Sequence, residues 1–440
     1  MKGLIHKTGR PRRTGRPARR FNRRGRWAIR LAAGLCLASA VMLLTSCPRP
    51  PKPLPIPRGP PGAPVTARPP VPVVRVCLSA RPLDHAAVHT GGAYVVQLDG
   101  RTVLGAAGAL DAQVLFRQGR WFLNSGDLGA GGTLSIVPVK SAVRYEGTTY
   151  RGWLNLVAMD GGFIVVNHVD LEEYLAGVLS RELYPSWAPA TYEALAVAAR
   201  TYAIYQVKTL GRSRAYDLGS DQGSQVYGGV SGETHRSRQA VAATYGLVLT
   251  CQEGGRQQVF KAQYSACCGG LTNPAEMLRD APRVAPLAGG QACDDCSGCR
   301  YYRWGTVRVS KADLADALAG MFPAASQWGG ISWVQVESAT PAGRPIWLIV
   351  HGRSGQGLRL RAQELRLAML HSGHDGLPRL PSMNCRIRDA GAYIEFTDGG
   401  GYGHGVGLCQ WGAQGKALRG WNYRQILSFY YPSSALLQAY

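Results

Sequence analysis

Hydrophobic and polar residues alternate in different ways along this chain, and each pattern predicts a different structure. Residues 31–44 form an uninterrupted apolar run. Between about residues 75 and 168, short β-rich runs such as AYVVQLDG, TLSIVPVK and GFIVVNHV are separated by glycine-rich turns. This alternation predicts a β-rich N-terminal region over residues 75–165. After residue 168 the apolar residues recur with the period of a helix.

Two consecutive helices are predicted after the β-rich region. The first begins at Asp170, which can cap it while Glu173 completes a capping box, and ends before Pro185. Its apolar face consists of Leu171, Tyr174, Leu175, Val178 and Leu179. The second helix runs from about Pro189 to Tyr205 and is rich in alanine, which permits close packing.

Glu182 continues the apolar stripe of the first helix. A carboxylate in that position needs a cation nearby, or its pKa rises into the range where it can donate a proton. The alternative is a helix end that turns into water. Arg200 lies among alanines on the second helix, where a charged side chain needs a fixed partner, and Glu182 is the partner we expect.

The remaining pattern indicates a mixed architecture. Residues 308–322 are expected to form a helix, residues 345–352 a strand, and residues 264–277 a strand end followed by a loop. We therefore predict an α+β fold, with a mixed domain over residues 166–432 in which residues 300–395 form a sub-domain.

The N-terminus resembles an export signal with a lipobox. Residues 1–30 are rich in arginine, the apolar run that follows is shorter than the roughly 20 residues of a membrane span, and Cys47 comes directly after small residues. Residues 1–47 are thus interpreted as a signal peptide, and Cys47 as the lipidated residue of an exported, membrane-anchored lipoprotein. A basic tail that binds nucleic acid and an uncleaved anchor are the alternatives.

The segment 48–74 contains 12 prolines, which is typical of an extended linker. Residues 1–74 also hold 16 of the 50 Lys and Arg residues and no acidic residue, so residues 75–440 carry 34 basic against 27 acidic residues. A net charge of +7 without a concentrated basic stripe argues against a nucleic-acid partner for the body of the protein.

A glycine-rich segment near the C-terminus is the second candidate site. Glycines at positions 399, 400, 401, 403, 405 and 407 leave His404, Gln410 and Trp411 to project between and after them. Such a segment lets backbone amides approach a ligand, and a saccharide fits better than a phosphate because the P-loop Lys and Ser or Thr are missing. A glycine-rich bulge with a structural histidine is the alternative.

Eleven cysteines raise the question of metal or disulfides. Two CxxC steps in a row place Cys293, Cys296 and Cys299 at the spacing of zinc ligands, and Cys268 would supply a fourth thiolate. In an exported protein disulfides compete with a structural zinc site, and both remain open.

Several segments together resemble the SpoIID/LytB family, also called the stage II sporulation protein D family. The similar segments appear in the family's order: VNHVDLEEYLAGVLSREL (166–183), ALAVAARTYAIYQ (194–206), SQVYGGV (224–230), YSACCGG (264–270), RAQELR (361–366) and GYGHGVGLCQWGAQGKAL (401–418). Studied members include lytic transglycosylases that act on peptidoglycan and proteins described as amidase enhancers.

The resemblance implies a catalytic role for Glu182 as the acid and for Arg200 as its neighbour. It also implies that Tyr264 and His404 line a substrate cleft, and Gln410 of the glycine-rich segment is a further substrate-binding candidate. A lytic transglycosylase needs one carboxyl group and no cofactor, because the muramic acid 6-hydroxyl attacks its own anomeric carbon and gives a 1,6-anhydro product. The expected partners are glycan strands, the membrane through the lipid anchor and, if the protein is a noncatalytic enhancer instead, a cell-wall amidase.

Overall fold

The computed structural model describes residues 69–79, 81–374 and 376–440. The predicted signal peptide, Cys47 and most of the proline-rich linker lie outside these residues. None of the helices in the described ranges is long and apolar enough to cross a membrane.

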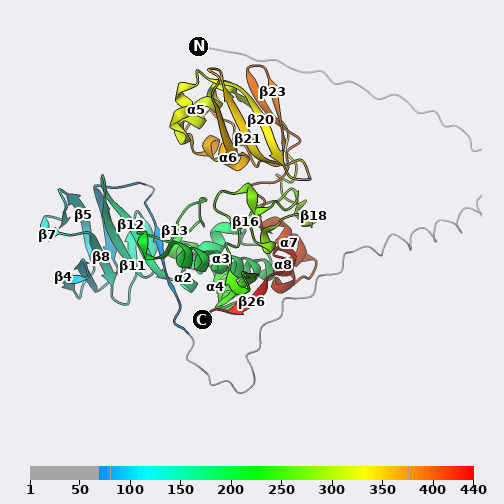
Figure 1. Ribbon diagram of the computed structural model, residues 1–440. Coiled ribbons are helices and arrows are strands. Elements are labelled where there is room, and N and C mark those ends of the chain that lie inside the picture. Colours follow the sequence, from blue (N-terminus) through cyan, green and yellow to red (C-terminus); the bar gives the residue numbers. More distant parts are fainter. Residues whose placement is uncertain (1–68, 80, 375) are drawn as a thin grey trace, which may run out of the picture. The chain divides into compact units, whose positions relative to one another are not determined.

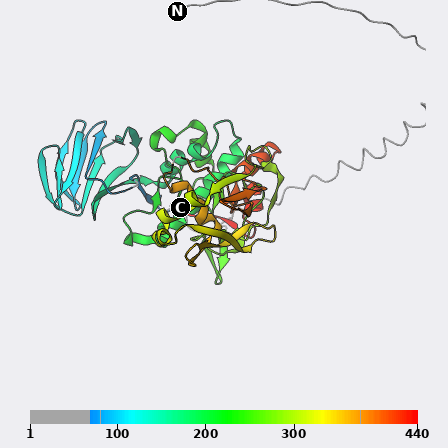
Figure 2. The ribbon, with the colours of Figure 1, turned by 90° about the horizontal axis from the view of Figure 1, so that it is seen from above.

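The N-terminal β-rich part is built from two antiparallel sheets that share one core (Figures 1 and 2). The first sheet has the order β13 (Leu218–Gly219), β1 (Val73–Cys77), β12 (Gly162–Asp170), β11 (Trp153–Met159), β8 (Thr133–Pro138), β3 (Tyr94–Leu98), β4 (Arg101–Ala106), with only β13 parallel to its neighbour. The second has the order β10 (Thr148–Tyr150), β9 (Val143–Tyr145), β2 (His85–Thr90), β5 (Asp111–Arg117), β6 (Arg120–Leu123), β7 (Gly126–Ala130). The rings of Trp121 and Phe163 meet 5.2 Å apart between the sheets.

Three helices follow β12 in the chain. They are α2 (Leu171–Glu182), α3 (Pro189–Leu210) and α4 (His235–Ala243). The predicted cap of α2 is confirmed, because the Asp170 carboxylate accepts hydrogen bonds from the amides of Glu172 and Glu173. The Glu173 side chain does not complete a capping box and lies 3.9 Å from Arg151. All five apolar residues predicted for the inner face of α2 are buried.

Segments from the C-terminal part of the chain pack against α3, whose small residues allow close contact. They include α7 (Gln410–Leu418) and α8 (Tyr423–Tyr430). The accompanying strands are β14 (Leu247–Glu253), β15 (Arg256–Val259) and β26 (Ala435–Gln438) in one sheet, and the pairs β16 (Tyr264–Ser265) with β25 (Leu408–Cys409) and β17 (Gly270–Leu271) with β18 (Ala292–Cys293). Figure 1 shows α3 in green beside the red α7 and α8.

A second hydrophobic core is formed by residues between Val309 and Phe396. Its elements are β19 (Val307–Ser310), α5 (Lys311–Met321), β20 (Ile331–Ala339), β21 (Pro345–Gly352), β22 (Gly357–Arg361), α6 (Ala362–His371), β23 (Arg386–Ala390) and β24 (Tyr393–Thr397). The strand predicted at 345–352 matches β21. The helix predicted over 308–322 begins three residues later, because residues 308–310 pair with β24. Short 3-10 turns complete the fold at η1 (Gly211–Ser213), η2 (Gly229–Gly232), η3 (Ala275–Met277), η4 (Ala285–Leu287), η5 (Asp294–Cys296) and η6 (Pro323–Gln327).

The architecture is therefore α+β, as the residue pattern predicts. Local periodicity was sufficient for this conclusion because the β-rich part and the helices occupy separate stretches of the chain.

Candidate functional site

Glu182 is the last residue of α2, at the position that the sequence predicts. The helix ends there because Leu183 is extended, with φ −123° and ψ 151°, and Pro185 follows. The apolar face of α2 holds the helix in the core, so its last turn carries the half-buried Glu182 side chain to the wall of a cavity.

Two hydrogen bonds orient the Glu182 carboxyl group. Its Oε1 accepts the backbone N–H of Val226 at 3.0 Å, and its Oε2 accepts the side-chain amide of Gln410 at 3.1 Å. Val226 belongs to the loop between β13 and η2, and Gln410 is the first residue of α7. Three segments that are far apart in the sequence thus converge on one carboxyl group.

Gly177 explains how the loop that holds Val226 comes so close to α2. A Cβ at this position would lie 2.8 Å from both the Tyr227 ring and the Gly229 carbonyl oxygen, which is closer than real Cβ contacts. The Gly177 carbonyl also accepts the N–H of Gly228 at 3.1 Å. The small residue in the middle of the helix therefore serves the packing of the loop that orients Glu182.

Within the described part of the chain, no Lys, Arg or His forms an ion pair with Glu182. Burial raises the pKa of Glu182 above its usual value, while the hydrogen bonds from Val226 and Gln410 act in the opposite direction. Burial is the larger effect because it penalises the charged form, whereas neither donor carries a full charge. The arrangement thus favours a carboxyl group that can carry a proton.

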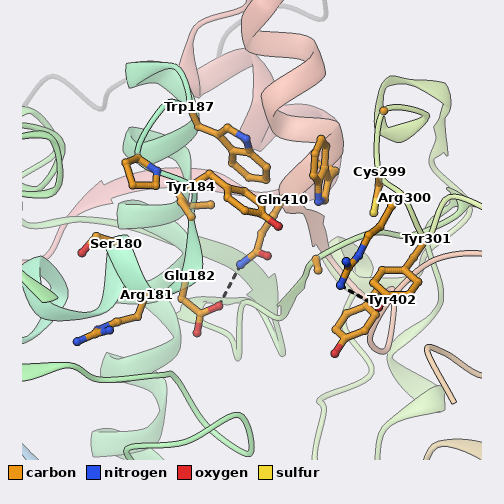
Figure 3. Close-up of a pocket in the computed structure, with 15 residues that line it drawn as sticks. Ser180, Arg181, Glu182, Tyr184, Trp187, Cys299, Arg300, Tyr301, Tyr402 and Gln410 are labelled. Carbon is orange, nitrogen blue, oxygen red and sulfur yellow. Dashed lines mark hydrogen bonds between the residues drawn. The ribbon is translucent and has the colours of Figure 1, made fainter. Parts of the chain in front are cut away.

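Glu182 faces a cavity of about 720 Å³ that α2, the loop 298–301 and the start of α7 enclose (Figure 3). Among the described residues that line it, Glu182 is the only carboxylate. The full lining consists of Ser180, Arg181, Glu182, Leu183, Tyr184, Pro185, Trp187, Ala266, Gly298, Cys299, Arg300, Tyr301, Tyr402, Gln410 and Trp411.

Aromatic rings form two groups on the cavity wall. Tyr184, Trp187 and Trp411 contact one another with ring centroids 5.2–5.8 Å apart. Tyr301 and Tyr402 lie 4.8 Å apart, and the Arg300 guanidinium stacks over Tyr301 at 4.6 Å. Figure 3 shows Tyr301 and Tyr402 across the cavity from Tyr184 and Trp187. Such rings offer flat apolar faces with polar edges, which suits a ring-shaped polar ligand.

Comparison with known proteins places this chain in a family. Residues 159–251 match the family model described as stage II sporulation protein, SpoIID. An uncharacterised protein of Brachyspira hyodysenteriae is 31% identical over 288 residues, which cover 65% of this chain and 72% of that protein. The chain belongs to the SpoIID/LytB family.

Two relatives of this SpoIID/LytB protein at lower sequence identity have descriptive names. Stage II sporulation protein D of Bacillus subtilis is 25% identical over 62% of this chain and 76% of its own length. The amidase enhancer of the same organism is 25% identical over 60% of this chain, but the match covers only 40% of that longer protein.

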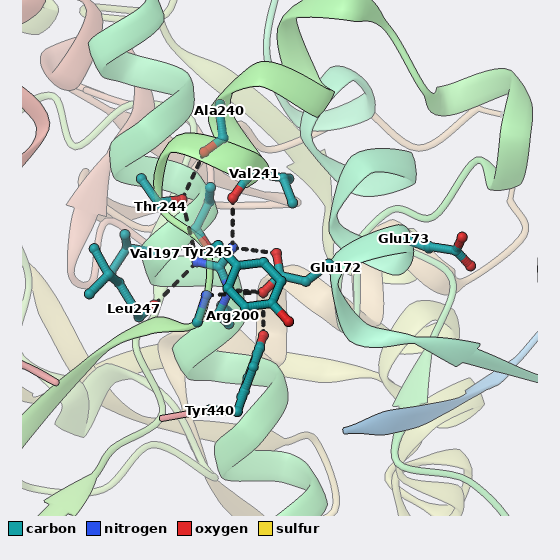
Figure 4. A network of polar contacts seen from close by, with 12 residues as sticks. Glu172, Glu173, Val197, Arg200, Ala240, Val241, Thr244, Tyr245, Leu247 and Tyr440 are labelled. Carbon is teal, nitrogen blue, oxygen red and sulfur yellow. Dashed lines mark hydrogen bonds and ion pairs between the residues drawn. The ribbon is translucent and has the colours of Figure 1, made fainter. Parts of the chain in front are cut away.

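The predicted pairing of Arg200 with Glu182 is wrong. Arg200 is fully buried and forms a two-pronged ion pair with Glu172 in the first turn of α2, with Nε–Oε1 and Nη2–Oε2 distances of 2.8 and 2.7 Å (Figure 4). The carbonyls of Ala196, Val241 and Leu247 and the Thr244 hydroxyl accept its remaining N–H groups. The first turn of α2 lies closer to Arg200 than the last turn does. Arg200, which the family resemblance placed beside the acid, therefore pairs with Glu172 and does not line the cavity.

Tyr264 and His404 lie behind the cavity wall. Neither is among the residues that line it. Burial raises the pKa of the Tyr264 hydroxyl well above its usual value, and the charge of nearby Glu182 raises it further. No residue in the described ranges forms a hydrogen bond with this hydroxyl. Burial lowers the pKa of His404 to about 4, and its Nδ1 accepts the Val406 N–H at 3.0 Å. The His404 ring is therefore neutral and held in place.

The glycine-rich segment turns its amides toward the protein itself, contrary to the expectation that they face a ligand. The N–H groups of Gly401, Tyr402 and Gly403 donate to the carbonyls of Tyr301, Cys267 and Pro381. Gly401, Gly403, Gly405 and Gly407 have positive φ, which lets this segment pass close to residues 263–269. Its glycines thus support the cavity, and Tyr402, Gln410 and Trp411 are the parts of the segment that reach it.

The cysteine set also differs from the predicted one. The four sulfurs that lie together belong to Cys268, Cys293, Cys296 and Cys409. Cys299, which the regular CxxC spacing favoured, lines the cavity instead. Cys409 carries no spacing signal in the sequence, because it is 141 positions from Cys268 and reaches the group only through the pairing of β25 with β16.

Sequence reasoning missed the residues that give the site its shape. Val226, Tyr184, Trp187, Tyr301 and Tyr402 come from loops without helical or strand periodicity. The QVYGG segment was recognised as part of the family pattern, but nothing in its residue types indicates that the amide of Val226 binds Glu182.

Proposed function

We propose that this protein is a peptidoglycan lytic transglycosylase that cleaves glycan strands between MurNAc and GlcNAc. The observation that carries the proposal is the state of Glu182. It is a half-buried carboxyl group with a raised pKa, it has two neutral hydrogen-bond donors, and it is the only carboxylate among the described residues lining an aromatic cavity.

A single carboxyl group is enough for this reaction. Most glycosidases use two carboxyl groups, one as the acid and one as the nucleophile or base that handles water. In the proposed reaction the protonated Glu182 donates its proton to the glycosidic oxygen as the C1–O bond breaks. The carboxylate then removes the proton of the muramic acid 6-hydroxyl as its oxygen bonds to C1. Glu182 is regenerated and no water is consumed.

The cavity fits a sugar strand in size and chemistry. Its volume of about 720 Å³ is within the range of ligand pockets, and the two aromatic groups provide faces on which sugar rings can stack. Arg300 and Arg181 add positive charge at the wall. Strands without stem peptides carry free lactyl carboxylates that these guanidinium groups would attract, so such strands are the substrate we favour.

The activity test uses residues 69–440 with intact strands and with peptide-free strands. Mass spectrometry should detect 1,6-anhydromuramic ends with the wild-type protein and at least about 10²-fold fewer with Glu182→Gln. Absence of these ends on both substrates would contradict the proposal, and so would their formation by the variant at a tenth or more of the wild-type rate.

A second candidate is a noncatalytic enhancer of a cell-wall amidase, which the similarity to the amidase enhancer of Bacillus subtilis favours. An enhancer would use the same cavity to hold the wall without chemistry at Glu182. Stem-peptide release by a purified amidase should then increase equally with the wild-type protein and with Glu182→Gln, and no anhydro ends should form. A loss of stimulation in the variant would favour the catalytic function.

We further propose that the protein is exported and anchored by a lipid at Cys47. The arginine-rich start, the apolar run and the position of Cys47 support this proposal. Metabolic labelling with a palmitate analogue should tag the wild-type protein and not Cys47→Ser, and the variant should leave the membrane fraction. Retention of label by the variant would contradict the assignment.

A further inference from the structure

Four buried cysteine side chains gather behind the cavity. Cys268 comes from the loop between β16 and β17, Cys293 and Cys296 come from β18 and η5, and Cys409 ends β25. Their four sulfur atoms all lie within 4.8 Å of one another, and the Cys268 and Cys296 sulfurs are 3.7 Å apart. We propose that these four cysteines bind one structural Zn²⁺ ion.

The spacing of the sulfurs matches a metal better than disulfides. Four ligands about 2.3 Å from a tetrahedral zinc ion are about 3.8 Å from one another. Two disulfides require each sulfur to have one close neighbour at about 2.05 Å, and they do not require the two pairs to meet. In this site every sulfur is close to all three others. Four thiolates without nitrogen or oxygen ligands form a set that favours zinc among common divalent ions.

Hydrogen-bond donors surround the sulfurs as they surround metal-bound thiolates. The Cys409 sulfur accepts the backbone N–H groups of Cys268 at 3.2 Å and Gly412 at 3.3 Å. The Cys293 sulfur lies 3.0 Å from the Tyr430 hydroxyl. Donors of this kind stabilise and orient ligands with negative charge. Cys409 also caps the N-terminus of α7 through this bond from Gly412.

Gly412 shows that the backbone is fitted closely around these sulfurs. A Cβ at this position would collide with the Tyr430 hydroxyl and with the Cys293 sulfur. The first turn of α7 can therefore approach the cysteine cluster only with glycine at this position. This close fit leaves the four sulfurs little room to separate.

A zinc ion in this position would tie together three segments that form the cavity wall. Gln410, which donates to Glu182, directly follows Cys409. Residues 298–301, which line the cavity, directly follow the segment of Cys293 and Cys296. The ion would have no open position for chemistry, because four protein ligands complete a tetrahedral structural site. This inference is independent of the proposed reaction, since it concerns metal content.

The first measurement is the metal content of the full-length protein, purified without added metal or chelator. Inductively coupled plasma mass spectrometry should find about one zinc ion per chain, which is the stoichiometry of one four-ligand site. X-ray absorption at the zinc edge should show only sulfur neighbours, at about 2.3 Å. Less than about half a zinc per chain, or iron in its place, would overturn the proposal.

The second measurement is the state of the thiols. Wild-type protein is denatured with chelator and alkylating reagent but without reductant, and its peptides are mapped. All four cysteines should be alkylated, because a metal site releases free thiols. Disulfide-linked peptides that join any two of the four would overturn the proposal. This result does not depend on any variant folding.

The third measurement uses matched variants. Cys296→Ser should lose the zinc, while Cys77→Ser, which removes a cysteine in β1 outside the cluster, should retain it. Equal zinc in both variants would overturn the assignment of Cys296 as a ligand. The zinc content of Gly412→Ala should fall as well, although all four ligands are retained, because its methyl group displaces the Cys293 sulfur.

Discussion

The first and last turns of α2 each carry a glutamate that is partly withdrawn from water, and the surroundings of the two differ. Glu172 meets the fully buried guanidinium of Arg200, and its side chain is 11% exposed. It also accepts bonds from the Gly246 N–H and the Tyr440 hydroxyl. Glu182, at the other end, has two neutral donors and no ion-pair partner in the described residues.

The two glutamates therefore have different roles: Glu172 is a structural carboxylate, and Glu182 is the candidate acid. At Glu172 the opposite charge of Arg200 compensates the cost of burial, and the contacts of this pair link α2 to α3, α4 and the C-terminus. At Glu182 the cost of burial is met only by neutral hydrogen bonds, so the neutral acid is favoured. A carboxyl group that is partly buried without a cation and faces a cavity, as Glu182 is, is therefore a candidate acid.

The largest expected effect is the loss of glycan cleavage when Glu182, which is the proposed acid, is replaced. Glu182→Gln should reduce the formation of anhydro ends by about 10²- to 10⁴-fold, the usual contribution of a general acid, and leave the fold intact. Turnover is measured at a temperature where circular dichroism shows both proteins folded. A variant that keeps a tenth or more of wild-type turnover would show that Glu182 is not the acid.

The next largest effect concerns the ion pair of Arg200 with Glu172 and should appear in the free energy of unfolding. Arg200→Met leaves the Glu172 carboxylate without its partner and should lower the free energy of unfolding by about 3–5 kcal/mol. Glu172→Gln with Arg200→Met should recover part of this loss, since no unpaired charge remains. Urea denaturation of the three proteins measures both values. If Arg200→Met folded with wild-type stability but lost activity, the comparison would be reversed.

A smaller effect concerns the pH dependence of stability. The folded pKa of Glu182 is raised above the ordinary value of 4.5. The folded state therefore binds this proton more tightly than the unfolded state does, and its contribution to stability is present below that ordinary value and lost as pH rises through the folded pKa. Each tenfold difference in proton affinity corresponds to about 1.4 kcal/mol.

Glu182→Gln cannot titrate and should escape this loss. Its unfolding free energy should approach that of the wild type at low pH, exceed it increasingly above pH 4.5, and reach a constant difference above the folded pKa. Denaturation of both proteins across this pH range tests the sign. A difference that shrinks as pH rises would mean that the folded state favours the ionised carboxylate.

The smallest effect concerns Tyr184, which we expect to contact the substrate without taking part in the reaction. Tyr184 is 57% exposed at the cavity, so Tyr184→Ala should raise KM about 3- to 10-fold with little change in kcat, the scale of one lost aromatic contact. Tyr216→Ala, at an exposed tyrosine that does not line the cavity, is the matched control. Equal changes in both variants would contradict a sugar-stacking role for Tyr184.

Local patterns predicted α2, its cap at Asp170 and the position of Glu182, because helix period and capping depend on neighbouring residues. They failed for the partner of Arg200. Both glutamates lie on the same helix, and only the packing of α3 against α2 decides which end the guanidinium reaches. The sequence does not show how far α3 is shifted along α2, and so it does not show which glutamate Arg200 reaches.

Contacts across long separations account for the other differences. The thiol of Cys409 joins the cluster through the pairing of β25 with β16, whereas regular spacing alone favoured Cys299. Likewise, glycines at 401–407 permit close approach, but the residue types do not say whether the approaching group is a ligand or residues 263–269. The candidate acid was therefore predictable, and so were Gln410 and Trp411 as site residues, but the other groups that surround Glu182 were not.

The pKa of Glu182 can be measured directly, and its value decides whether this residue can act as the acid. Residues 69–440 labelled with ¹³C at the glutamate carboxyl groups are titrated by NMR, and the Glu182 signal is assigned by its absence in Glu182→Gln. Because burial raises the pKa of Glu182, we expect a midpoint above 4.5 in the free protein. A midpoint at or below that value would contradict the role of Glu182 as the acid, because the folded protein would then not favour its protonated form.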